Sequence, residues 1–156
     1  MIAQEYLVNA GEGLRLAVPP DWKRSAVVVF SNGHDGEEGA SVVARRESLD
    51  PRIGLQQYMD GLLVELARTL PAFSLLERRQ RTISGASAGE FIYILTAKGM
   101  EYQQRQICVI DAPGSVLSLV LSSGRKRAPD FSDLWEQILD SATLVPIGPA
   151  AGHVGE

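Results

Sequence analysis

The chain has 156 residues, of which 45% are hydrophobic and 22% are charged, and its formal net charge is −4. This length fits a single domain that buries about 70% of its unfolded surface. The composition is that of an ordinary globular protein, and the acidic balance argues against nucleic acid or an anionic membrane as a main partner.

The start of the sequence does not resemble a secretion signal, because no basic segment precedes an apolar run. No run of about 18 apolar residues is present that could span a bilayer. The one cysteine, Cys108, cannot form a disulfide within the chain, which suits a reducing compartment. We therefore expect a cytoplasmic protein that does not insert directly into a membrane.

The N-terminal part contains four short strand candidates, at residues 5–9, 14–18, 25–31 and 40–46. In the third candidate, apolar residues occupy positions 27–30 in succession, so both of its faces are apolar, whereas a strand with one wet face alternates. The glycine-rich acidic segment 32–39 suggests a metal site, but its spacing does not match a calcium-binding loop. We expect a solvated hairpin loop there.

Two segments have the apolar spacing of amphipathic helices. The first follows Asp50 and Pro51, which are favourable N-cap and first-turn residues, and Pro71 ends it. Asp130 is the expected N-cap of the second. We expect the first stripe to face the core rather than a partner. The stripes are Leu55, Tyr58, Met59, Leu62, Leu63, Leu66 and Leu70, then Phe131, Leu134, Trp135, Ile138 and Leu139.

Residues 73–83 form a further strand candidate with a charged middle, from Glu77 to Arg81. Its arginines could contact phosphate groups. However, no aromatic residues are interleaved with them and the chain is acidic, so we favour a solvated sheet edge.

The segment 91–110 has the pattern of a β-hairpin, because two β-rich runs flank a glycine-containing turn at residues 98–99. Such a turn places Tyr93 opposite Gln104. Both faces near the base of this hairpin are apolar, so we expect both to be covered. One face would contain Phe91, Tyr93, Leu95, Tyr102, Gln104, Gln106 and Cys108.

The strands group into hairpins rather than into β-α-β units, and residues 115–123 supply one more strand. This pattern predicts an α+β fold, with a mainly antiparallel twisted sheet and two helices on one face. We expect one domain over residues 1–145. The tail, residues 146–156, has no periodicity and is expected to be disordered.

No residue constellation points to catalysis. His34 lies in the acidic loop and His153 in the tail, and no Gly-x-Ser-x-Gly motif is present. Cys108 has no nearby histidine and is surrounded by apolar residues, which indicates a buried, inert thiol. We expect no enzyme, no metal and no cofactor.

The sheet itself remains as the candidate site. Two helices can cover about one face, and a large uncovered apolar face usually marks an interaction site. Gln104 and Gln106 add amides to that face, which suits a helical guest that is mostly but not wholly apolar. The alternative is a homodimer interface that binds nothing else, and the residues alone do not choose between the two.

In order and spacing, the chain resembles the Eag family, the effector-associated chaperones of bacterial type VI secretion, which belong with the wider DcrB-like and PsbP-like fold. The resemblance covers residues 6–145. It rests on Leu14, Leu16 and Val18 before Pro-Pro-Asp-Trp22, on Val27, Val29 and Phe30, on residues 40–43 with Arg46, on Tyr58, Leu63, Leu70, Pro71 and Phe73, and on Gly85, Gly99, Arg105 and Gln106.

The resemblance implies a cytoplasmic homodimer whose concave sheet faces form a hydrophobic groove. That groove would hold the N-terminal transmembrane helices of a secreted effector and help to load it on the secretion spike. Carried over by position, the groove residues would be Val27, Val29, Val43 and Gln106, and the hairpin face adds Phe91, Tyr93 and Gln104. Some family members have an amide on the first helix, where this chain has Leu62.

Two other hypotheses stay open. The chain could be a DcrB-like or PsbP-like binding protein of unknown ligand that acts as a dimeric interaction module. It could also be a small-molecule-binding enzyme on the same fold, although the lack of clustered histidine, aspartate or serine residues argues against this.

Overall fold

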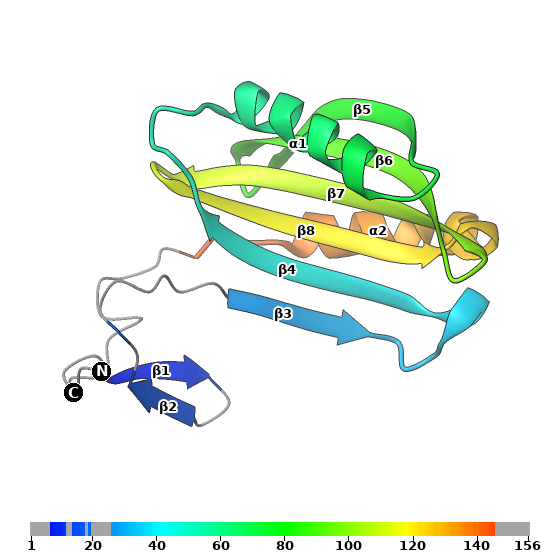
Figure 1. Cartoon of the computed structure of the whole chain (residues 1–156), viewed down its shortest axis with the longest axis horizontal. Coiled ribbons are helices and arrows are strands. Elements are labelled where there is room, and N and C mark those ends of the chain that lie inside the picture. Colours follow the sequence, from blue (N-terminus) through cyan, green and yellow to red (C-terminus); the bar gives the residue numbers. More distant parts are fainter. Residues whose placement is uncertain (1–6, 12–13, 18, 20–25, 146–156) are drawn as a thin grey trace. The chain divides into compact units, whose positions relative to one another are not determined.

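The computed structural model describes residues 7–11, 14–17, 19 and 26–145 (Figure 1). The chain divides into two compact units. One unit contains strands β1 (Leu7–Gly11) and β2 (Leu14–Ala17), which pair antiparallel as a small sheet. The other spans Ser25–Leu144 and contains the main sheet. The predicted disordered tail lies outside the described residues.

The main sheet has six strands, each antiparallel to its neighbours, in the order β3-β4-β8-β7-β6-β5. Strands β5 to β8 form a continuous meander, while β3 and β5 are the two edges (Figure 1). The strands are β3 (Ala26–Ser31), β4 (Ala40–Ser48), β5 (Ser74–Ile83), β6 (Ala86–Ala97), β7 (Met100–Ala112) and β8 (Ser115–Gly124).

The predicted central hairpin is confirmed with its register. Lys98 and Gly99 both have positive φ values, 51° and 75°, the backbone geometry of a two-residue hairpin turn. The turn pairs Tyr93 with Gln104 and Phe91 with Gln106, as the sequence predicts. Residues of alternate parity on β6 and β7 therefore belong to opposite faces of the sheet.

The α+β class is confirmed, but the expectation that both helices lie on one face is wrong. Helix α1 (Leu55–Thr69) covers one face and helix α2 (Ala128–Ser141) the other (Figure 1). Met59 of α1 packs with Phe91, while Trp135 of α2 packs with Ile107 on the opposite side. An apolar stripe shows that a helix buries one side, but not which sheet face receives it. The base of the hairpin is apolar on both faces, and this pattern was the sign that each face is covered by its own helix.

The predicted stripe of α1 packs in the core, and so does that of α2 except for Leu134, which is 45% exposed. Each helix begins at a different residue from the predicted one. Asp50 caps a preceding turn instead of α1, because its Oδ1 accepts a hydrogen bond of 2.9 Å from the backbone N–H of Arg52. Gly89 lets α1 approach the sheet closely, since a Cβ there would lie 2.8 Å from Cε of Met59. Helix α1 therefore packs directly against the backbone of Gly89 in β6.

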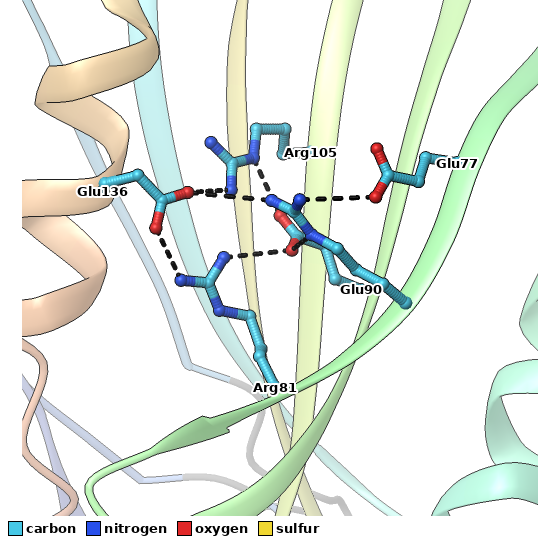
Figure 2. Close-up of polar contacts among 6 residues, drawn as sticks. Glu77, Arg81, Glu90, Arg105 and Glu136 are labelled. Atoms are coloured by element: carbon cyan, nitrogen blue, oxygen red, sulfur yellow. Dashed lines mark hydrogen bonds and ion pairs between the residues drawn. The ribbon is translucent and has the colours of Figure 1, made fainter.

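The α2 face contains a network of charged side chains beside its apolar core (Figure 2). Glu90 on β6 is fully buried, with 0% of its surface exposed. Its carboxylate accepts hydrogen bonds from Arg79 Nε at 2.7 Å, from Arg81 Nη1 at 3.0 Å and from Arg105 Nε at 2.8 Å. Glu136 of α2 accepts further bonds from Arg81 at 2.8 Å and from Arg105 at 2.5 Å.

This network joins α2 to three strands through ionised groups. Burial alone would raise the pKa of Glu90, but the hydrogen bonds and charges of the three arginines lower it overall. Hydrogen bonds from Arg81 and Arg105 lower the pKa of Glu136 to about 2. The prediction of an edge strand at 73–83 is confirmed by the position of β5, and its arginines at 79 and 81 are occupied by carboxylates.

Candidate functional site

All seven predicted groove positions fall on the α1 face of the sheet, in three adjacent cross-strand rows. The central row runs Val29, Val43, Val120, Gln106 and Phe91 from the β3 edge inwards. On one side of it lies a row with Val27, Arg45 and Ser118, and on the other a row with Ser31, Ser41, Ser122, Gln104 and Tyr93. The register therefore brings together strands that are far apart in sequence.

Helix α1 divides this face into a covered and an open half. Phe91 and Tyr93 lie beneath the helix with 0% and 1% of their surfaces exposed, and Gln106 is also buried. The first two are core residues and not walls of an open surface. Gln104 is only partly buried, so it and Gln106 mark the boundary between the two halves.

The open half is centred on the edge strand β3. Val27 and Val29 are 54% and 60% exposed on the α1 side, and Val28 and Phe30 are 49% and 65% exposed on the α2 side. Val43 and Val120 are partly buried and form the floor beside them. Four consecutive exposed apolar side chains on a sheet edge are the mark of an interaction surface.

Sequence reasoning missed two residues of this floor, Val120 and Ser122. The signal was available, because Ser118, Val120 and Ser122 alternate with the leucines of β8 and therefore share one face of the sheet. Only the β4–β8 pairing shows that this face continues the surface of β3.

A chain of polar contacts lies at the boundary between the covered and the open half of the α1 face. The Tyr93 hydroxyl lies 2.8 Å from Oε1 of Gln104 and 3.1 Å from Oε1 of Gln106. A phenol has one proton, so it donates to only one of them at a time, and Gln104 has the shorter contact. The Gln104 Nε2 group then donates to Ser122 Oγ at 3.3 Å. These contacts fix the amide of Gln104 at the border of the open surface.

Cys108 lies in the covered half and is fully buried. Burial raises the pKa of its thiol to about 12, although a hydrogen bond with Gln106 acts in the opposite direction. The thiol is therefore protonated at neutral pH, which agrees with the predicted inert cysteine.

The acidic segment 32–39 is a hairpin loop between β3 and β4, as predicted. It contacts the basic turn at 125–127, with Glu37 3.5 Å from Lys126 Nζ and Glu38 3.3 Å from Arg127 Nε. His34 lines a small cavity beside this loop. Across the residues that the structure describes, no three His, Cys, Asp or Glu side chains are grouped to hold a metal ion.

The family comparison decides the kinship of the chain, because residues 12–141 match DcrB. The chain belongs to the DcrB family. A search of the curated proteins finds no match. Of the helices that the structure describes in this DcrB-family chain, none is long and apolar enough to cross a bilayer.

Solved structures share the fold of this DcrB-family protein. PA94, a protein of unknown function from Pseudomonas aeruginosa, matches with a TM-score of 0.73 and 23% identity over 90% of this chain and 96% of its own. LpqN, involved in cell envelope biogenesis of Mycobacterium tuberculosis, matches with a TM-score of 0.62 and 22% identity over 77% and 71%. Cyanobacterial PsbP from Synechocystis sp. PCC 6803 matches with 0.53 and 11% over 84% and 86%. These likenesses place the sheet and helices in the PsbP-like and DcrB-like fold.

Proposed function

We propose that this protein is a cytoplasmic chaperone and adaptor that binds N-terminal transmembrane helices of a type VI secretion effector. The observation that carries the proposal is the open half of the α1 face, where Val27 and Val29 are exposed at the edge of the sheet. Gln104, which is partly buried, borders this surface and can offer its amide to a guest, while Gln106 is buried next to it. The guest would be held before export and delivered to the secretion spike.

The physical need for such a host is simple. A transmembrane segment exposed to water aggregates unless another surface covers its apolar side chains. Burial is worth about 25 cal/mol per Å². A surface covering several hundred Å² therefore contributes several kcal/mol, from which the loss of translational and rotational freedom is subtracted. The open half offers apolar side chains from β3, β4 and β8 for this contact.

The width of the open half supports a homodimer. From β3 to β7 the row crosses three strand spacings, which is about 14 Å. The apolar part of a transmembrane helix is about 30 Å long. One copy therefore covers about half of a guest. Two copies that pair antiparallel through their β3 edges would keep Val27 and Val29 of both on one face and would cover the whole span.

A dimeric interaction module of unknown ligand is the second candidate. Val28 and Phe30 favour it, because they are exposed on the α2 side of β3, where a guest on the α1 side does not reach them. A second copy packed against the α2 side of β3 would cover these side chains. The two candidates share the dimer and differ in whether a guest helix is bound.

A pull-down with paired variants tests the proposal. The bait is the protein, and the prey is the N-terminal segment of a candidate effector, prepared with and without its transmembrane stretch. We expect recovery only of the form with that stretch, and loss of recovery in Val29→Asp. Val64→Asp is the matched control, because Val64 is a 68% exposed valine that lies on helix α1 and not on the sheet. Equal recovery of both prey forms would contradict the chaperone function.

A further inference from the structure

A cleft lies between helix α1 and the edge strand β5. It consists of two cavities, of about 240 and 630 Å³, whose linings share Gln56 of α1 and Gln80 of β5. The larger volume falls in the range of small-ligand pockets, which is about 300–1000 Å³. We call the two cavities together the α1–β5 cleft. It is built on β5 and β6, whereas the open half is on β3, β4 and β8, so the two surfaces use different strands.

Small residues of β6 keep the cleft hollow. Gly89 lies under Met59 of α1 in the smaller cavity, and Ser87 lines the larger one. Gln80 of β5 pairs with Gly89 in register, and Thr82 pairs with Ser87. Because cross-strand partners share a sheet face, the side chains of Gln80 and Thr82 belong to the α1 face, where they form the β5 wall of the cleft.

The charged groups at the walls are already paired. Arg78 Nη2 lies 2.8 Å from Oδ1 of Asp60, while Arg79 and Arg81 bind Glu90. Among the described residues that line the cleft, none has a carboxylate, an ammonium group or an aromatic ring. A metal ion would therefore lack carboxylate ligands, and a nucleobase would lack a ring to stack on. The cleft suits an uncharged ligand that binds through hydrogen bonds.

The uncharged polar groups of the cleft are mainly amides. They belong to Gln56, Gln57 and Gln80, with hydroxyl groups from Thr82 and Ser87. Gln56 Oε1 accepts a hydrogen bond of 3.2 Å from Arg78 Nη2, which leaves its N–H groups to donate. Gln57 and Gln80 are exposed, and each amide can both donate and accept. A peptide group is the matching partner, because it also has one donor and one acceptor.

The spacing of these groups matches an extended chain. Gln80 and Thr82 are two residues apart on β5, which is about 7 Å. Peptide groups that point in the same direction along an extended chain also repeat about every 7 Å. From Arg78 to Thr82 the β5 wall spans four residue steps, so the cleft is about 14 Å long and fits about four extended residues.

We propose that the α1–β5 cleft binds a short, uncharged, extended peptide segment of a partner protein through its backbone groups. The amides of Gln56, Gln57 and Gln80 bind N–H and C=O groups of this segment. The proposal goes beyond the proposed function and does not depend on it, because the cleft and the valine surface lie on different strands. An adaptor with both sites can hold a guest helix and a flexible peptide at the same time.

The test uses the ¹⁵N-labelled protein and the peptide acetyl-(Gly-Ser)₃-amide, which is uncharged and has no apolar side chains. Two-dimensional NMR follows the side-chain amide signals of Gln56, Gln57 and Gln80 during the titration. We expect saturable shifts with a Kd in the millimolar range, since only a few hydrogen bonds form. The same peptide with a methyl group on every backbone nitrogen should bind about fivefold more weakly or less, because its donors are removed.

Three variants locate the binding. Gln57→Ala and Gln80→Ala should each weaken binding about fivefold, because each removes one hydrogen-bonding amide at an exposed position. Ser87→Trp should abolish binding by filling the larger cavity. Gln137→Ala is the matched control, because Gln137 is an exposed glutamine of α2 outside the cleft, and its affinity should not change. If Ser87→Trp does not fold, the two glutamine variants decide.

The outcomes separate this proposal from others. Absence of saturable shifts at the three glutamines would overturn it, and so would equal binding of the methylated peptide. Tighter binding of trehalose or inorganic phosphate than of the peptide would assign the cleft to another class of ligand and would also overturn it. Unchanged affinity in both glutamine variants would place the peptide elsewhere. The pull-down of a transmembrane segment reports on the valine surface alone, so failure of either proposal can be told from failure of the other.

Discussion

The two edges of the main sheet are built from opposite chemistry. Strand β5 carries arginines that pair with Glu90, Glu136 and Asp60, and its Arg78 also lies over the ring of Phe91 at 5.4 Å from its centroid. Strand β3 has four successive exposed apolar side chains. Charged residues are a standard protection of a sheet edge against pairing with other chains. One edge is thus closed by charge, and the other is left fit for association.

The largest effect is expected at the closed edge. Glu90→Gln removes a buried carboxylate and leaves Arg79, Arg81 and Arg105 with too little negative charge. Loss of one partner of a buried ion pair typically costs about 3–5 kcal/mol, so we expect a decrease of this order in the free energy of unfolding, measured by urea denaturation. Glu77→Gln is the control, because its ion pair with Arg79 is largely exposed and should contribute little. Equal effects of both substitutions would show that burial of Glu90 does not matter.

The open edge should behave in the reverse way. Val29→Asp changes an exposed side chain, so the free energy of unfolding should move by less than about 0.5 kcal/mol. Its effect should appear instead as loss of solubilisation of a transmembrane client, measured by centrifugation of client and protein together. If the variant unfolds, Val29 belongs to a core and the open surface lies elsewhere.

Association through β3 can be tested by itself. The protein should be a dimer by light scattering at micromolar concentration, against a monomer mass of 16.9 kDa. Val28→Asp, on the α2 side of the same strand, should shift the population towards monomer, because two copies would place charges on a shared apolar surface. A wild-type mass near that of a monomer over a wide concentration range would contradict the dimer.

The carboxylates that pair with the arginines of β5 should also make the free energy of unfolding depend on pH in the acidic range. The pKa values of Glu90 and Glu136 are lowered in the folded state, that of Glu136 to about 2 from an ordinary value of 4.5. Their contribution is therefore fully present above about pH 4.5 and is lost as the pH falls towards 2. Denaturation curves at several pH values should show a smaller decrease over this interval in Glu136→Gln than in the wild type. An identical decrease would assign the acid sensitivity to other carboxylates.

The smallest effect is expected in the loop beside the open edge. Alanine substitution of His34, Asp35, Glu37, Glu38 and the tail residue His153 should change the free energy of unfolding by less than about 0.5 kcal/mol per removed pair, because exposed ion pairs contribute little. Client binding should stay nearly unchanged. A clear loss of binding by this variant would show that the loop takes part in the site.

The sequence was sufficient where local chemistry decides the structure. The turn at Lys98 and Gly99 predicted the register of β6 and β7, and the apolar stripes predicted both helices. It was not sufficient where distant segments meet. Nothing local to Glu90 indicates that two of its arginine partners also bind Glu136. In sequence, Glu136 lies 31 residues from Arg105 and 55 residues from Arg81.

The candidate site divides along the same line. Val27, Val29 and Val43 could be assigned to one face from strand alternation, and the structure keeps them together. Phe91 and Tyr93 share that face, but alternation cannot tell which part of it a helix covers. The position of β3 at an edge also depends on strand order, because β4 pairs on its other side with β8.

The pairing of β4 with β8 has a consequence for synthesis of the chain. Residues 40–48 pair with residues 115–123, so β4 cannot take its place until nearly the whole meander has left the ribosome. Among the described strands, β3 pairs with β4 alone, and it is translated earlier than every strand of that meander. Pairing between segments so distant in sequence is slow, and unpaired apolar strands are prone to aggregate while they wait. During synthesis, the apolar strand β3 therefore stays unpaired until β4 and β8 have met. The rate of elongation and early binding by cellular chaperones should then affect how much of the protein folds.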